Sequence, residues 1–128
     1  MKIKVIAFVL GVLGYSVGAL AAPIQGYVQI QYVGGWDPAL PTSPPTPNGT
    51  LVFFTLTTTP NGATNAYTGG PSCATGNRFV LDLTSRAGKT QYATLLAAKL
   101  VANAVTVKGS ADCSIWPDSE AVNWLTIN

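Results

Sequence analysis

Histidine is absent from the sequence, and charged residues are scarce: seven are Lys or Arg and five are Asp or Glu among 128. Without histidine, the chain contains no Ser-His or Cys-His catalytic pair and no histidine-ligated metal. A formal net charge of +2 provides no basic field that would attract nucleic acid. The low charge, combined with 48% hydrophobic residues, also excludes the composition typical of disordered chains. The composition therefore predicts a folded protein that is neither a histidine-dependent enzyme nor a nucleic-acid-binding protein.

Familiar cofactor motifs are missing as well. The sequence has no internal repeat, no glycine-rich phosphate loop and no zinc-type spacing of its two cysteines. We therefore expect no metal and no cofactor. The length is sufficient for one domain and a leader.

Residues 1–21 have the features of a secretory signal peptide. Lys2 and Lys4 precede an apolar run, residues 5–15, and small residues follow that run. The alternative is an uncleaved membrane anchor, because the run continued to Ala22 is nearly long enough to span a bilayer. The small residues at its end favour cleavage.

The cleavage point follows from those small residues. Ala19 and Ala21 form the small pair that precedes a signal-peptidase site. Cleavage after Ala22 would place Pro23 directly across the scissile bond, where its ring hinders the peptidase. We therefore expect cleavage after Ala21, and a periplasmic or secreted mature chain, residues 22–128, that forms one domain with no membrane segment.

Export would bring the two cysteines into an oxidising compartment. Cys73 and Cys113 are therefore expected to form a disulfide. The bridge would close a loop of about 40 residues and stabilise the domain by about 4 kcal/mol in the loop-entropy model.

Alternation of apolar and polar residues predicts a mostly β fold with one helix. We expect strands at residues 24–32, 50–59, 78–83, 104–109 and 120–128 and a helix at residues 86–102. The inward face of the first strand would comprise Ile24, Gly26, Val28, Ile30 and Tyr32. The order β-β-β-α-β-β favours a five-stranded OB-like barrel or curled sheet.

The helix is apolar on more than one face. One half of its wheel holds Tyr92, Ala93, Leu96, Ala97, Leu100 and Val101, and we expect this half to cover the sheet. The smaller second face, Leu95, Ala98 and Ala102, would then contact another subunit or the long loops of its own chain. Thr84 or Ser85 is the expected N-cap, and Asn103 the expected left-handed residue after the helix.

Two long loops are candidates for binding. Residues 36–49 contain five prolines and form a stiff connection or a recognition element for a proline-binding groove. Residues 60–77 form the second loop. Trp36, in the first loop, is the weak candidate for a ligand contact.

The order of elements resembles that of the receptor-binding B subunits of bacterial A–B toxins with pentameric B rings, in the subtilase-cytotoxin and pertussis-like branch. The likeness lies in Ala87-Gly88-Lys89 through Val105-Thr106-Val107 and in Cys113-Ser114-Ile115-Trp116. The chain is also similar to small uncharacterised exported bacterial proteins. The resemblance implies a homo-oligomer with helices around a central pore, although the proline-rich first loop departs from the family. No sugar-contacting residue is carried over.

The residues favour a non-catalytic binding module over an enzyme. A neutral surface rich in Thr, Asn and Gln suits a glycan or protein receptor, and sugar rings stack on aromatic side chains. The candidate aromatic residues are Trp36, Tyr67, Trp116 and Trp124. Of these, Trp116 is expected to pack on the disulfide.

Two alternatives stay open. An envelope or inhibitor protein would contact only another protein. A small glycosidase or a calcium site would use the carboxylates of Asp112, Asp118 and Glu120. Turns also carry Asp simply to bind their own backbone.

Overall fold

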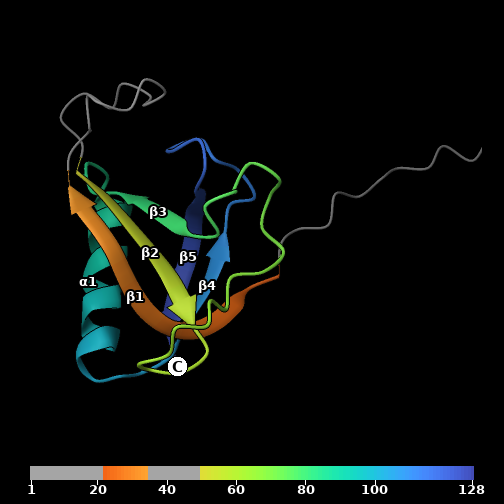
Figure 1. The fold of residues 1–128 in the computed structure, drawn as a ribbon. Helices are drawn as coiled ribbons and strands as arrows, with labels where there is room; N and C mark the ends of the chain where they lie inside the picture. Colours follow the sequence, from red (N-terminus) through yellow and green to blue (C-terminus); the bar gives the residue numbers. More distant parts are fainter. Residues whose placement is uncertain (1–21, 35–49) are drawn as a thin grey trace, which may run out of the picture.

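The computed structural model describes residues 22–34 and 50–128 (Figure 1). The elements are β1 (Ile24–Gly34), β2 (Leu51–Thr57), β3 (Phe79–Asp82), α1 (Arg86–Leu100), β4 (Val105–Gly109) and β5 (Glu120–Ile127). The expected signal peptide, the proline-rich loop and Trp36 lie outside the described residues. The prediction of a mostly β fold with five strands and one helix is confirmed, with strand ends shifted by one or two residues.

The five strands close into a ring in the order β1-β2-β3-β5-β4. Neighbours are antiparallel except β3 and β5, which run parallel through Phe79↔Glu120 and Val80↔Ala121. The ring closes where the start of β1 pairs with β4, from Ile24↔Val107 to Gly26↔Val105. A Cβ added at Gly26 would lie 2.9 Å from the Leu56 Cβ, so glycine permits the close approach of β1 to β2 here.

The inside of the ring is a continuous apolar core, shared by all five strands and α1. Its largest fully buried side chains include Phe54, Phe79, Leu56, Leu81 and Leu95. The Phe54 and Phe79 rings stack with their centroids 5.4 Å apart, and Tyr67 meets Phe79 edge-on at 4.9 Å. Tyr67 thereby anchors the loop that follows β2 in the core.

A second apolar cluster, which we call the outer cluster, lies outside the ring. It contains Leu51, Phe53 and Val80, with the half-buried Ile115 and Trp116 packed against them. Trp116 meets Phe53 edge-on at 5.3 Å and packs against this outer cluster, whereas Cys113 packs against the inner core. The segment between β4 and β5 thus covers the first half of the outer face of β2, and Asn65 in the loop after β2 contacts Thr55 and Thr57 on the second half. All seven residues of β2 are buried.

The expected inward position of Tyr32 is wrong. Ile30 pairs with Phe54 and Tyr32 pairs with the adjacent Phe53, so β1 carries an extra residue, Gln31, at a bulge. Because the bulge reverses the alternation, Tyr32 lies on the outside, 49% exposed, with its ring 6.0 Å from that of Phe53.

The ends of α1 are fixed by two caps. Ser85 is the N-cap, and its hydroxyl accepts a hydrogen bond from the Gly88 N–H at 2.9 Å. At the other end, the Asn103 N–H donates to Ala98 O at 3.0 Å and the Ala102 N–H donates to Lys99 O at 3.3 Å. The left-handed residue of this Schellman motif is Ala102 (φ 51°), not Asn103 as expected, and the helix ends at Leu100.

The predicted orientation of α1 is also wrong. Leu95 and Ala98 are fully buried against the sheet, whereas Leu96, Leu100 and Val101 are 37%, 86% and 64% exposed. The buried face includes Gly88, where an added Cβ would collide with the Asp82 carbonyl. Small residues on this face let the helix approach the ring of strands closely. The larger side chains of Leu96 and Leu100 on the opposite face would keep the helix further from the ring.

The expected disulfide is present: Cys73 and Cys113 are bonded, with their Cα atoms 6.2 Å apart. The bridge joins the loop before β3 to the segment after β4, and so ties together the ends of the strand–helix–strand unit. A structural disulfide is typical of proteins outside the cytoplasm. Within the described ranges, no helix has the length and apolar character needed to cross a membrane.

Candidate ligand-binding site

A hollow of about 580 Å³ opens between the first half of α1 and β5. We call it the Trp124 hollow. Its lining residues are Arg86, Ala87, Thr90, Gln91, Asn123, Trp124 and Leu125. The floor is therefore apolar and aromatic, and the rim carries hydroxyl, amide and guanidinium groups.

Three residues on one side of α1 contribute to the rim. Ala87, Thr90 and Gln91 share that side, because residues three and four apart are neighbours on a helix. The Thr90 hydroxyl donates to Arg86 O at 3.1 Å, which keeps a lone pair of its oxygen available. Gln91 bridges to the sheet, since its side-chain N–H donates to Asn123 O at 3.3 Å.

A bulge in β5 shapes the other side of the hollow. Lys108 pairs with Trp124, but the next pair is Gly109 with Val122, so Asn123 has no partner in the ladder. Its carbonyl is free to accept the hydrogen bond from Gln91. The bulge leaves the Trp124 side chain on the outside of the ring, 41% exposed.

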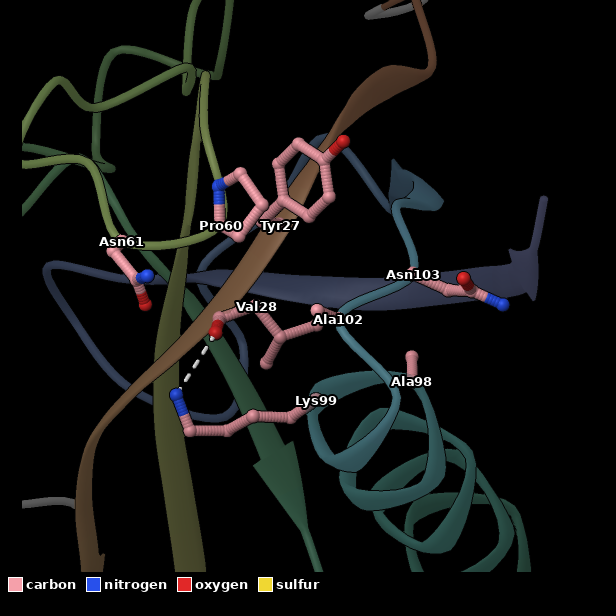
Figure 2. A pocket seen from close by; sticks show the side chains of 8 residues that line it. All are labelled: Tyr27, Val28, Pro60, Asn61, Ala98, Lys99, Ala102 and Asn103. Atoms are coloured by element: carbon pink, nitrogen blue, oxygen red, sulfur yellow. Dashed lines mark hydrogen bonds between the residues drawn. The ribbon is translucent and has the colours of Figure 1, made fainter.

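A second, smaller hollow of about 180 Å³ lies at the other end of α1 (Figure 2). It is lined by Tyr27, Val28, Pro60, Asn61, Ala98, Lys99, Ala102 and Asn103. The Lys99 ammonium crosses this space and donates to Val28 O at 3.3 Å (Figure 2). It also donates to Gln29 Oε1 at 3.3 Å. Because the Lys99 ammonium already has hydrogen-bond partners within the protein, we interpret this hollow as a packing gap between α1 and β1.

The expected aromatic candidates have different surroundings. Tyr67 is 7% exposed and donates its hydroxyl to Glu120 Oε2 at 2.6 Å, and Trp116 packs on Phe53. Trp36 lies outside the described residues. Of the three described candidates, Trp124 is therefore the one whose side chain is partly exposed and lines a hollow.

The carboxylates of the three acidic residues that were candidates for a catalytic or calcium site each form hydrogen bonds or a salt bridge within the protein. Glu120 is 1% exposed and accepts hydrogen bonds from Tyr67 Oη and, at 3.0 Å, from the Ala111 N–H. Asp118 forms a salt bridge with Arg78 at 3.1 Å. Asp112 accepts from the Ser114 N–H and hydroxyl, as in an Asx turn. Residues 22–34 and 50–128 contain no group of three or more His, Cys, Asp or Glu placed to hold a metal ion.

Two of these contacts shift a pKa. Burial and the neighbouring Glu120 carboxylate raise the pKa of Tyr67 above its usual value, because both disfavour the tyrosinate. Hydrogen bonds from Ser114 lower the pKa of Asp112 by stabilising its ionised form. The interactions that shift both pKa values also hold loops in place, so they have a structural explanation.

Comparison with known proteins finds no match: no protein-family model, no curated protein and no solved structure resembles the chain significantly.

Sequence reasoning named Trp124 as one of four aromatic candidates but did not single out Arg86, Thr90 or Gln91. Their signal was weak: a polar row at helical spacing is ordinarily a solvated face. The bulge at Asn123 brings these residues close to Trp124, and the alternation of apolar and polar residues in the sequence does not reveal it.

Proposed function

We propose that the protein is an exported, non-catalytic binding module and that its ligand is a saccharide bound over Trp124. The observation that carries this proposal is a half-exposed indole ring in an open hollow rimmed by Thr90, Gln91 and Asn123. The flat face of an aromatic ring packs against the C–H face of a sugar, and neutral hydroxyl and amide groups bind sugar hydroxyls. Sites of this kind combine an apolar surface with a few placed polar groups.

The non-catalytic part of the proposal is supported by the carboxylates. Glycoside hydrolysis requires two carboxyl groups on either side of a bound substrate. Asp112, Asp118 and Glu120 instead bind their own backbone, an arginine and a tyrosine. None of the three lines the Trp124 hollow.

The fold supports membership of the OB-type architecture, which binds oligosaccharides in many proteins. Closure of a ring in the order β1-β2-β3-β5-β4, with a helix between β3 and β4, is the supporting feature. The proposed likeness to receptor-binding toxin B subunits rests on this order together with the disulfide.

The experiment is a glycan array probed with residues 22–128 and with two variants. We expect wild-type protein to bind a defined set of glycans, Trp124→Ala to lose binding at least about tenfold, and Trp124→Phe to retain part of it. Tyr32→Ala is the matched control, because Tyr32 is an equally exposed aromatic residue on a different strand. Absence of any bound saccharide, or binding that Trp124→Ala leaves unchanged, would contradict the proposal.

Export and processing form part of the same proposal. We expect mature protein to begin at Ala22, in the periplasm or the medium. Intact-mass analysis of exported protein tests this directly, since retention of residues 1–21 would add their mass.

A second function is favoured by the outer face of α1, which comprises Ala93, Leu96, Ala97, Leu100 and Val101, all exposed. We infer that this apolar face contacts another protein surface, and a second copy of the chain would make the protein a homo-oligomer. Size-exclusion chromatography with light scattering separates the two cases. A wild-type monomer would exclude the homo-oligomer and leave a protein receptor or inhibited enzyme as the partner.

A further inference from the structure

We propose that the ligand of the Trp124 hollow is an acidic saccharide, whose carboxylate or sulfate group is bound by Arg86 and Lys108. This inference rests on the proposed function, because it names the class of sugar that the same site selects. The observation behind it is the distribution of charge around the indole ring.

One basic side chain lines the hollow, a second pairs with Trp124 across the strands, and no acidic residue lines the hollow. Arg86 belongs to the lining. Lys108 is the cross-strand partner of Trp124, so the two side chains project from the same face of the sheet with their Cβ atoms about 5 Å apart. A sugar ring stacked on Trp124 would therefore have one cation in the lining of the hollow and a second on the strand next to Trp124.

Neither cation forms an ion pair with an acidic residue of the described chain. Within residues 22–34 and 50–128, the one salt bridge joins Arg78 to Asp118, and neither the Arg86 guanidinium nor the Lys108 ammonium forms a hydrogen bond. Asp82 is the acidic residue closest to Arg86 in the sequence. Its Oδ1 accepts from the Thr84 N–H and hydroxyl, at 2.8 and 2.6 Å, and forms no ion pair with Arg86.

Two other cations of the described chain, Arg78 and Lys99, have structural roles. Arg78 lies 4.6 Å from the centre of the Phe53 ring and pairs with Asp118. Lys99 donates to Val28 O and Gln29. Each of these two has protein partners, whereas the side chains of Arg86, Lys89 and Lys108 have none among the described residues. Of these three, Lys89 neither lines the hollow nor pairs with a residue that does.

The charge of Arg86 does not stabilise α1 either. Arg86 is the first residue of α1, and the first turn contains no acidic residue. A cation at this end of a helix is opposed by the helix dipole, so the charge does not stabilise α1. A local preference that is violated without a compensating contact is typical of a functional position. Guanidinium groups bind planar carboxylates and sulfates through paired hydrogen bonds.

The probe is trigalacturonic acid, compared with its methyl ester by isothermal titration calorimetry at 50 and 300 mM salt. Esterification removes the charge and keeps the sugar rings. We expect the acid to bind at least about tenfold more tightly than the ester at low salt, and this advantage to shrink at high salt. Arg86→Gln and Lys108→Gln should each lower affinity for the acid about three- to tenfold and leave the ester unchanged.

Lys89→Gln is the matched control, because Lys89 is an exposed cation on α1 that does not line the hollow. It should bind the acid as wild type does. A polyglutamate peptide tests for attraction to negative charge alone, and we expect it not to bind.

Failure of this inference differs from failure of the proposed function. If a neutral saccharide binds through Trp124 and the acid has no advantage, or if polyglutamate binds equally well, the acidic class is wrong and the saccharide site stands. If no saccharide of either kind binds, or if Trp124→Ala leaves binding intact, both proposals are overturned.

Discussion

Strand β2 and helix α1 both carry apolar side chains on two faces, yet only β2 is covered on both. Every residue of β2 is buried, because the inner core covers one face, and the outer cluster together with the loop after β2 covers the other. Helix α1 has one buried face, at Leu95 and Ala98, and an opposite face on which Leu100 is 86% exposed. An apolar segment is therefore covered only where the chain supplies a second layer.

For the first half of β2, that layer is the segment between β4 and β5, which we call the cover segment, residues 110–119. Three links hold it in place: the disulfide at Cys113, the Arg78–Asp118 salt bridge and the contact of Trp116 with Phe53. No described residue covers the outer face of α1. The difference predicts that substitutions on α1 and in the cover segment have very different costs.

The largest effect is expected on the buried face of α1. Leu95→Glu places a charge in the core without a partner, and we expect it to lower the free energy of unfolding by at least about 4 kcal/mol or to prevent folding. Leu95→Ala, which leaves only a cavity, should cost about 2–5 kcal/mol. Circular dichroism during urea unfolding measures both. A folded Leu95→Glu variant of normal stability would show that this face is not the core face.

The next largest effect is expected from the bridge that holds the cover segment. The double variant Cys73→Ser with Cys113→Ser removes the cross-link without leaving a free thiol. We expect a loss of about 2–5 kcal/mol, because the unfolded chain gains freedom. Urea unfolding of wild type in the presence of reductant provides the control and should give the same loss. An unchanged urea midpoint in both samples would contradict the prediction.

A smaller effect is expected from Tyr67, which binds Glu120 where the cover segment ends. Tyr67→Phe leaves the buried carboxylate with one partner fewer and should cost about 1–3 kcal/mol at pH 7. Because the folded pKa of Tyr67 is raised above its unfolded value, its contribution is complete below about pH 10 and is lost as the pH rises further. The difference between wild type and variant should therefore shrink at alkaline pH.

Thermal unfolding between pH 7 and 11 tests this prediction. Tyr32→Phe is the control, because it removes a tyrosine hydroxyl from an exposed side chain. A Tyr67→Phe difference that grows above pH 10 would contradict the assigned direction.

The smallest effect on folding is expected on the outer face of α1. Leu100→Glu should change the free energy of unfolding by no more than about 0.5 kcal/mol, since the side chain is almost fully exposed. If this face binds another copy of the chain, the same substitution should reduce the mass measured by light scattering. Severe unfolding would show that an intramolecular layer covers Leu100.

The comparison also explains what could be predicted from the sequence. Strand periodicity, the cap at Ser85 and the disulfide depend on neighbours along the chain or on compartment chemistry, and all three were confirmed. The orientation of α1 was predicted wrongly because both of its faces are apolar. Which face packs depends on how closely the helix can approach the ring, and that depends on Gly88 and Ala98.

Less of the candidate site could be predicted from the sequence. A bulge adds one residue without disturbing composition, so the shifts at Gln31 and Asn123 were not visible in the alternation. The second shift determines the position of Trp124 beside Gln91. Pairing of Lys108 with Trp124 is likewise a property of register, which is set by tertiary packing.

The short seam between β1 and β4 has a consequence for the order of folding. Three residue pairs close the ring, and they join Ile24–Gly26 to Val105–Val107, segments from opposite ends of the described chain. Contacts between such distant segments form slowly, because the loop entropy is lost before the contact is gained. If the chain is exported N-terminus first, as proposed above, β1 reaches the far side of the membrane before β4. We expect the β1–β2 hairpin to form first and the ring to close last.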